Sequence, residues 1–368
     1  MRRYYIKTYG CQMNVADSAK LADVLREYGY REVGSEEEAD LILVNTCVVR
    51  QGAEDRAAWH VTSLKGVKKS GVLIGLCGCM VTEPGRDVKK DFPHVDFFIP
   101  PHNTEKLRRI LATHSPKRPS PAKAGEGGPS PQAMVSEVFI TIMTGCNNYC
   151  SYCVVPYVRG PETSRAMDEV LAEVEQAIKA GAQNITLLGQ NVNAYKYGLA
   201  TLLNNINPLI HSRLPSPVFR FLTSHPRDMS DEIIEAVATL PYVDKEVIMP
   251  LQSGDDRVLK AMNRGYDLDY YRGRVSRLRS LVPGIRIISD LIVGFPGETE
   301  AEFERTLRAV EEFKFTVVNM FAYSGRPETA ASRLPGQLPE EVIKARLQRL
   351  IATVRGVIKK LSKPNLTA

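Results

Sequence analysis

Three cysteines stand close together near the middle of the chain, at Cys146, Cys150 and Cys153. Thiolates at this spacing can hold one small inorganic group without help from distant residues. A structural zinc ion normally takes four ligands, and no fourth Cys or His lies nearby in the sequence. A 4Fe–4S cluster held by three thiolates leaves one iron open to another ligand. The spacing therefore favours such a cluster; a zinc site completed from elsewhere and three unrelated core cysteines are the alternatives.

A second set of three cysteines, Cys11, Cys47 and Cys79, is dispersed along the first part of the chain. Each follows an apolar run typical of a β-strand, and each separation is close to the roughly 30 residues of one strand–helix–strand unit. The carboxyl ends of parallel strands meet at one edge of a sheet, where α/β proteins bind their ligands. We therefore expect these three thiols to meet and to bind a metal group, the alternative being small buried core residues.

Cys77 competes with Cys79 for the third place in this dispersed set, because both have the same strand parity. We choose Cys79 because Gly78 can turn the chain just before it, and we expect Cys77 to be a packed, inert thiol. No dinucleotide fingerprint of spaced glycines follows the first apolar run, so a nicotinamide site is not expected.

The elements that must position these cysteines form two α/β segments. In residues 1–113, strands are expected at Tyr4–Thr8, Asp40–Asn45, Val72–Leu76 and Val95–Ile99, with helices near Ala16–Tyr28, Ala53–Lys65 and Thr104–Ala112. This alternation predicts a parallel sheet with helices on both faces. Residues 114–134 are rich in Pro, Gly and Ser and predict a flexible linker.

The alternation resumes over residues 135–330. Strands are expected at Val138–Thr144, Asn184–Leu188, Val218–Thr223, Lys245–Met249, Ile285–Leu291 and Thr316–Phe321, and the clearest helix at Met167–Lys179. Six strand–helix units are fewer than the eight of a closed barrel and predict an open, partial (β/α)6 barrel. A basic helix over Pro339–Leu361, within a last segment 331–368, completes the chain.

Composition places the chain among ordinary soluble proteins, with 43% hydrophobic and 24% charged residues. We expect no signal peptide and no membrane span, because the longest apolar stretch is too short to cross a bilayer. Seven cysteines are then better explained by metal binding in a reducing cytoplasm than by disulfides. The net charge of +6 is compatible with a nucleic-acid partner.

The segment from Cys146 to Cys153 resembles the signature of the radical S-adenosylmethionine superfamily, with Tyr152 in its aromatic place. The resemblance implies that the amino and carboxylate groups of S-adenosylmethionine bind the open iron. It also implies that an electron from the cluster then cleaves the sulfonium to give a 5′-deoxyadenosyl radical.

Both cysteine sets together resemble the methylthiotransferases of this superfamily. The segments that carry the resemblance are Thr8–Asn14, Val44–Arg50, Gly78–Met80, Val154–Gly160 and Gly294–Thr299. Three more, Leu187–Tyr195, Thr223–Pro226 and Leu251–Gly254 with Met262–Tyr266, are similar to the branch that modifies isopentenyl-adenosine in tRNA. Family members usually end with a small RNA-binding β-barrel, for which this chain has no room before Ala368. We expect either a fragment or tRNA binding through the remaining surfaces.

The resemblance implies a transferase with two 4Fe–4S clusters and S-adenosylmethionine. The cluster on Cys146, Cys150 and Cys153 would generate the radical, and the cluster on Cys11, Cys47 and Cys79 would carry the sulfur. The product would be methylthiolated at carbon 2 of the adenine beside the anticodon. An electron donor such as flavodoxin or ferredoxin is implied, and we expect a cytoplasmic monomer.

Two other functions remain open. A methylthiotransferase could act instead on threonylcarbamoyl-adenosine in tRNA or on a ribosomal protein. A non-catalytic iron–sulfur protein for electron transfer or sensing is of another class, and three-cysteine sites disfavour it because electron carriers usually supply four protein ligands.

Further candidate cofactor contacts are Tyr152, Arg159, Gln190, Asn191 and Phe295. Arg159 could bind the cofactor carboxylate or a phosphate. Gln190 and Asn191 could pair with the base or the cofactor, and Phe295 could shape an adenine pocket. The alternatives are a surface ion pair, loop capping and a simple tight turn.

Overall fold

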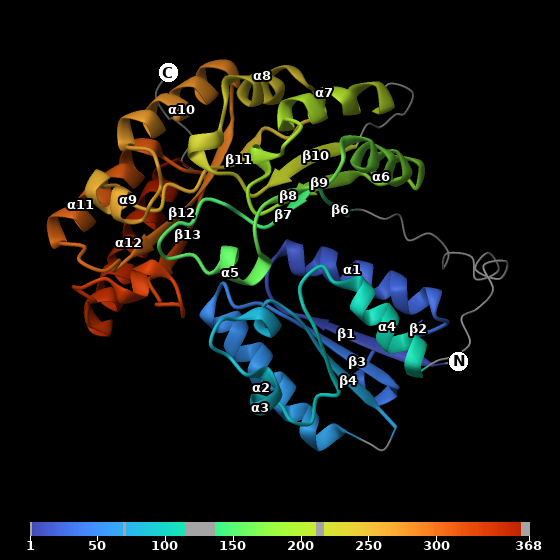
Figure 1. Cartoon of the computed structure of the whole chain (residues 1–368). Coiled ribbons are helices and arrows are strands. Elements are labelled where there is room, and N and C mark those ends of the chain that lie inside the picture. Colours follow the sequence, from blue (N-terminus) through green and yellow to red (C-terminus); the bar gives the residue numbers. More distant parts are fainter. Residues whose placement is uncertain (1, 69–70, 115–136, 211–216, 362–368) are drawn as a thin grey trace. The chain divides into compact units, whose positions relative to one another are not determined.

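The computed structural model describes residues 2–68, 71–114, 137–210 and 217–361 (Figure 1). The chain divides into two compact units. The N-terminal unit contains Met1–Met134 together with Val154–Gly160, and the C-terminal unit contains Val135–Cys153 and Pro161–Ala368. Except for His114, the predicted linker 114–134 lies outside the described residues. No described helix is both long enough and apolar enough to cross a membrane.

The N-terminal unit is built on a five-stranded parallel sheet with strand order β2-β1-β3-β4-β5. The strands are β1 (Arg3–Thr8), β2 (Arg31–Glu32), β3 (Leu41–Thr46), β4 (Leu73–Gly78) and β5 (Phe97–Ile99). All six residues of the central strand β3 are buried, as its continuous apolar run predicts for a strand covered on both faces.

Helices cover both faces of this sheet, as predicted (Figure 1). They are α1 (Gln12–Glu27), α2 (Gln51–Val67), α3 (Val88–Asp91) and α4 (Thr104–His114). Alternate side chains of β3 point to opposite faces. Leu41 and Leu43 pack in the cluster formed with α1 and α4, while Ile42 and Val44 pack in the cluster formed with α2.

A short helix from much later in the sequence, α5 (Val155–Arg159), completes the N-terminal unit. Val154 and Val158 join the apolar cluster on the α2 face of the sheet. The hydroxyl of Thr82 donates a hydrogen bond to the carbonyl of Val158 at 2.8 Å. That residues directly after Cys153 belong to this unit was not expected from the sequence.

The C-terminal unit contains six parallel strands that follow chain order in two groups of three. The strands are β6 (Glu137–Thr141), β9 (Asn184–Leu188), β10 (Val218–Leu222), β11 (Glu246–Ile248), β12 (Arg286–Val293) and β13 (Val317–Ala322). Two backbone hydrogen bonds connect β10 to the segment that leads into β11. The amide of Phe219 donates to the carbonyl of Tyr242 at 2.8 Å, and the amide of Asp244 donates to the carbonyl of Phe219 at 2.9 Å. The predicted partial (β/α)6 barrel is confirmed.

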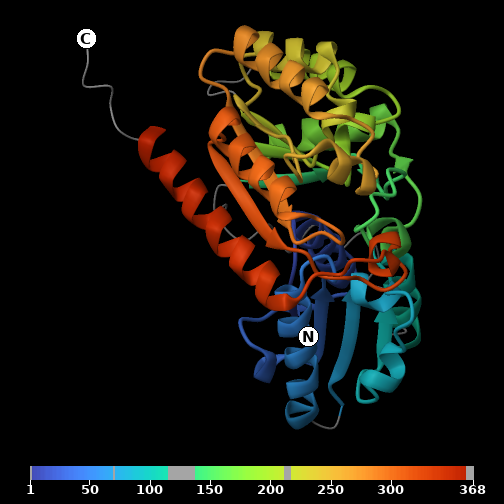
Figure 2. The same cartoon turned by 90° about the vertical axis from the view of Figure 1, so that its left-hand side faces the viewer.

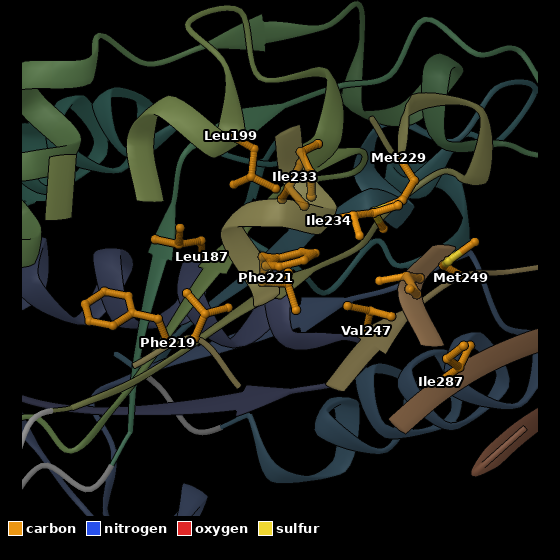
Figure 3. Close-up of a cluster of buried hydrophobic side chains, with 14 of the residues drawn as sticks. Leu187, Leu199, Phe219, Phe221, Met229, Ile233, Ile234, Val247, Met249 and Ile287 are labelled. Atoms are coloured by element: carbon orange, nitrogen blue, oxygen red, sulfur yellow. The ribbon is translucent and has the colours of Figure 1, made fainter. Parts of the chain in front are cut away.

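Helices on the outside of these strands enclose the largest apolar core. They are α6 (Met167–Lys179), α7 (Leu199–Ile210), α8 (Asp231–Thr239), α10 (Leu268–Leu281) and α11 (Glu300–Phe313). The short helix α9 (Asp256–Ala261) packs instead in a smaller apolar cluster with Phe295 and Tyr323. Figure 3 shows Phe221 of β10 and Val247 of β11 in this core with Ile234 of α8 and Leu199 of α7. A short antiparallel pair, β7 (Met143–Thr144) with β8 (Thr163–Ser164), was not predicted.

The basic C-terminal helix α12 (Glu340–Leu361) runs alongside α11 and β13 (Figure 2). Leu350, Val354 and Val357 bury one face of it in the core. Arg346 lies 2.8 Å from a carboxylate oxygen of Glu298, and Arg349 pairs with Glu300 and Glu304. These two basic residues therefore stabilise the docked helix.

Candidate functional site

The three dispersed cysteines each follow a different strand of the N-terminal sheet. Cys11 lies after β1 at the start of α1, Cys47 follows β3, and Cys79 follows β4. These three strands are neighbours in the sheet, so the thiols meet at its carboxyl edge. Burial raises the pKa of Cys79 to about 12, which Arg159 opposes and the neighbouring thiols of Cys47 and Cys11 increase. Burial and then the thiol of Cys11 likewise raise the pKa of Cys47.

Buried amides join the loops that carry Cys11 and Cys47. The side-chain nitrogen of Asn14 donates to the carbonyl of Thr46 at 2.8 Å, and that of Asn45 donates to the carbonyl of Asn14 at 2.8 Å. Cys11 Sγ lies 3.3 Å from Asn14 Oδ1. These loops are consequently held in one geometry before any metal binds.

Two glycines make the close approach of these loops possible. Gly10 has a φ of +122°, and a Cβ on it would lie 2.5 Å from Cys47 Cβ. Gly78 has a φ of +91°, and a Cβ on it would lie 2.5 Å from the carbonyl oxygen of Thr46. A side chain at either position would be strained and would push the cysteine loops apart.

Arg159, the last residue of α5, lies beside the dispersed cysteines within the N-terminal unit. Its side chain is 3% exposed, and its Nη2 is 3.2 Å from Asp17 Oδ2. Its Nη1 is 2.6 Å from His102 Nε2, and His102 Nδ1 is 2.7 Å from Asp17 Oδ1. Burial opposes its charge, but Cys79, Asp17 and Cys11 more than offset this, so the pKa of Arg159 is raised. Its contact with the cofactor carboxylate stays a prediction. The neighbours that it has here are thiols, the carboxylate of Asp17 and the imidazole of His102.

The compact cysteine loop is held by the segment that follows α9. The amide of Ser151 donates to the carbonyl of Met262 at 3.0 Å, and the side chain of Asn263 donates to the carbonyls of Asn148 and Tyr149 at 3.1 and 3.0 Å. Burial and then the neighbouring thiol of Cys150, against a backbone hydrogen bond from Asn148, raise the pKa of Cys146. Neighbouring segments thus fix the loop that presents the thiols.

Arg264, for which the sequence indicated no role, contacts this compact set of cysteines. It is 4% exposed, and its Nη1 lies 3.3 Å from both Cys150 Sγ and the hydroxyl of Tyr152. It belongs to the segment Met262–Tyr266, which was noted only for its resemblance to one branch of a family. Spacing could not reveal the contact, because more than a hundred residues separate Arg264 from Cys150.

Gln190 positions the compact loop through its side chain. Its Oε1 accepts a hydrogen bond from the amide of Gly145, the residue before Cys146, at 2.6 Å. Asn191 donates to Asp228 at 2.6 Å, and its buried Oδ1 has no partner among the described residues.

Phe295 is completely buried and packs edge-on against Tyr323, with ring centroids 5.7 Å apart. Tyr152 borders the same apolar cluster. Contacts of Tyr152, Gln190, Asn191 and Phe295 with a cofactor stay predictions.

The donor sets have the chemistry of iron–sulfur ligands. Each is made of three thiols with no disulfide among them, and each has an arginine beside it that favours the deprotonated thiolates. Within the described residues, no three His, Cys, Asp or Glu side chains converge tightly enough for a single metal ion. A 4Fe–4S cube needs a wider arrangement, because each thiolate binds a different iron.

The two units match two known protein families. Residues 3–100 match "Uncharacterized protein family UPF0004", and residues 140–310 match the "Radical SAM superfamily". The radical S-adenosylmethionine methyltransferase TsrM from Kitasatospora setae has a similar fold, with a TM-score of 0.69 at 13% identity over 97% of this chain and 89% of TsrM. The cobalamin-dependent radical enzyme OxsB has a TM-score of 0.59 at 11% identity, over 98% of this chain and 56% of OxsB. The partial barrel with its compact cysteine loop is that of a radical S-adenosylmethionine enzyme.

Curated relatives show to which family of radical S-adenosylmethionine enzymes the chain belongs. The tRNA-2-methylthio-N(6)-dimethylallyladenosine synthase of Syntrophotalea carbinolica is 40% identical over 96% of this chain and 83% of that protein. The protein of the same name from Clostridium perfringens is 39% identical over 95% of this chain and 81% of that protein. The chain belongs to the radical S-adenosylmethionine methylthiotransferase family that includes these synthases, and the resemblance noted in its sequence is confirmed.

Proposed function

We propose that this protein attaches a methylthio group to carbon 2 of isopentenyl-modified adenosine beside the anticodon of tRNA. The observation that carries the proposal is the presence of two separate three-thiol sites, one in each unit, in a chain that is 40% identical to a synthase of this name. Removing hydrogen from an unactivated aromatic carbon is beyond ordinary acid–base catalysis, which is why the reaction would need radical chemistry.

Cys146, Cys150 and Cys153 would hold the radical-generating 4Fe–4S cluster. When bound, this cluster supplies one electron and an open iron site for S-adenosylmethionine. Gln190 keeps the loop before Cys146 in place through the amide of Gly145. Asn191, Tyr152 and Phe295 are proposed to orient or enclose the cofactor, and the buried unpaired Oδ1 of Asn191 is the clearest free acceptor among them.

Cys11, Cys47 and Cys79 would hold a second 4Fe–4S cluster, which when bound supplies a site for the transferred sulfur. Their convergence at the edge of three neighbouring strands supports this assignment. Arg159 would offset the negative charge of these thiolates, and Asp17 and His102 hold its guanidinium in position. Cys77, which is 1% exposed in the apolar cluster with Leu107 and Leu111, would remain an inert thiol.

The partners follow from this chemistry. Reduction of the radical-generating cluster calls for a one-electron donor such as flavodoxin or ferredoxin. We place the enzyme in the cytoplasm with its tRNA substrate, acting as a monomer.

The test uses anaerobically reconstituted protein with S-adenosylmethionine, a reductant and tRNA that bears isopentenyl-adenosine. Nucleoside mass spectrometry should detect the methylthio product. A variant with Ala at positions 11, 47 and 79 should still form 5′-deoxyadenosine but no methylthio product. Cleavage of S-adenosylmethionine with product only on threonylcarbamoyl-adenosine tRNA, or on neither tRNA, would refute the proposed substrate.

A further inference from the structure

Arg264 is a buried cation that pairs with no carboxylate among the described residues. Its Nε contacts the hydroxyl of Tyr266 at 3.1 Å, its Nη1 contacts Cys150 Sγ and the hydroxyl of Tyr152, and its Nη2 contacts the carbonyl of Pro250 at 3.0 Å. Arginine keeps its proton even when it is buried, so this positive charge is permanent.

Two other buried arginines each pair with a carboxylate, which is the usual way to compensate for a buried positive charge. Arg159 lies 3.2 Å from Asp17, and Arg346 lies 2.8 Å from Glu298. Within the described part of the chain, no Asp or Glu forms an ion pair with Arg264. A buried charge is costly unless an opposite charge compensates for it.

The sulfur within hydrogen-bond reach of Arg264 is that of Cys150, at 3.3 Å. Thiols lose their proton when they bind a metal, and the cluster then carries the charge of its thiolates. The other groups that its guanidinium contacts are the hydroxyls of Tyr152 and Tyr266 and the carbonyl of Pro250, which are neutral acceptors. His225, whose ring contacts that of Tyr266, is also buried and is neutral at pH 7.

We propose that Arg264 is a positioning residue that supplies the counter-charge for the cluster on the compact cysteine loop, donating a hydrogen bond to Cys150 Sγ. Hydrogen bonds to cluster sulfurs and nearby charge set the reduction potentials of such clusters. A positive charge stabilises the reduced, more negative state, so Arg264 makes the electron uptake that precedes radical formation easier. This inference rests on the radical-generating cluster of the proposed function and not on its tRNA substrate.

The experiment measures the midpoint potential of this cluster alone. All variants carry Ala at positions 11, 47 and 79, so that the only proposed cluster site left is the compact one, and the full-length protein is titrated anaerobically with detection by electron paramagnetic resonance. Arg264→Met removes the charge and keeps an apolar side chain of related length. We expect the equilibrium constant for one-electron reduction to fall at least tenfold, which is about 59 mV in midpoint potential.

Two matched variants separate charge from packing. Arg264→Lys retains the charge and should recover at least half of the shift, whereas Tyr266→Phe removes only a neutral neighbour and should change the constant less than twofold. A fully loaded Arg264→Met protein whose constant lies within twofold of the parent would overturn the inference. So would an Arg264→Lys protein that behaves like Arg264→Met.

A second readout compares the Tm of each apo-protein with its Tm after loading to the same iron content. The rise in Tm on cluster loading should be smaller in Arg264→Met than in the parent, because the cluster no longer neutralises a buried cation. A purely structural arginine would lower the Tm of the apo and loaded forms equally, and that result would contradict the proposal. A wild-type protein with the expected potential but no methylthio product would instead count against the proposed function.

Discussion

Replacing Gly10 with Ala should impair metal binding at the dispersed cysteines and leave the compact cysteine site intact. A Cβ at residue 10 would lie 2.5 Å from Cys47 Cβ and 2.9 Å from Asn14 Oδ1, on a backbone with a φ of +122°. Strain of this backbone costs about 1–3 kcal/mol. Overpacking in a closely packed site adds about 1–3 kcal/mol.

The expected loss is therefore about 2–6 kcal/mol, a large part of the roughly 5–15 kcal/mol that holds a typical protein folded. It falls on the loops of Cys11 and Cys47, so metal binding at the dispersed cysteines should fail first. The compact loop belongs to the other unit and has none of these contacts.

Gly85→Ala is the matched control. Gly85 also has a positive φ, of +75°, but nothing lies within 4 Å of a Cβ built there. It should show backbone strain without the collision. Iron analysis after anaerobic reconstitution should give about eight irons per chain for Gly85→Ala and about four for Gly10→Ala.

Denaturant titration of the apo-proteins then measures the two losses of stability. In Gly10→Ala, formation of 5′-deoxyadenosine should persist while the methylthio product disappears. Full iron content in Gly10→Ala, with a stability loss no larger than that of Gly85→Ala, would show that the close contact with Cys47 does not organise the site.

Two further predictions concern buried charge. Arg159→Met should destabilise the apo-protein by about 3 kcal/mol in denaturant titrations, because the buried Asp17 carboxylate loses its permanent cation and is left with the imidazole of His102. Adding Asp17→Asn should restore much of the loss, and an additive double variant would contradict this coupling. For His225, burial and then the positive charges of Arg264 and Arg227 lower the pKa to about 2. Because the unfolded state binds this proton and the folded state does not, stability should fall by about 1.4 kcal/mol per pH unit below about pH 6.5. His225→Asn should remove that component between pH 4.5 and 6, and an unchanged slope would refute it.

The parts of the fold that follow from local patterns were predicted well. Helix α6 has the predicted bounds, Met167–Lys179, because its apolar face repeats with helical period and Gly181 follows it. The neighbouring thiols of Cys11, Cys47 and Cys79 follow from a general rule of parallel sheets and needed no knowledge of side-chain packing. Strand β2 was missed because its two residues, Arg31 and Glu32, are exposed and carry no apolar signal.

Contacts between distant segments could not be predicted in the same way. The five residues of α5 give too short a periodic pattern to show which core they join, and so the surroundings of Arg159 were not foreseen. The local sequence does not distinguish Arg264 from an exposed basic residue in a loop, since nothing in it indicates burial. The importance of Arg264 depends on its partners in the described parts of the chain, a thiol, two hydroxyls and a carbonyl, which only the three-dimensional structure reveals.

The place of α5 means that the two units are not interchangeable modules. The backbone passes from one unit to the other three times, and the seven residues Val154–Gly160 that complete the N-terminal unit lie inside the radical S-adenosylmethionine segment of the gene product. An N-terminal fragment cut at residue 134 would lose Val154 and Val158 from its apolar cluster and Arg159 from beside its thiols. Recombination or truncation at the apparent boundary would therefore leave the unit that carries Cys11, Cys47 and Cys79 without part of its core.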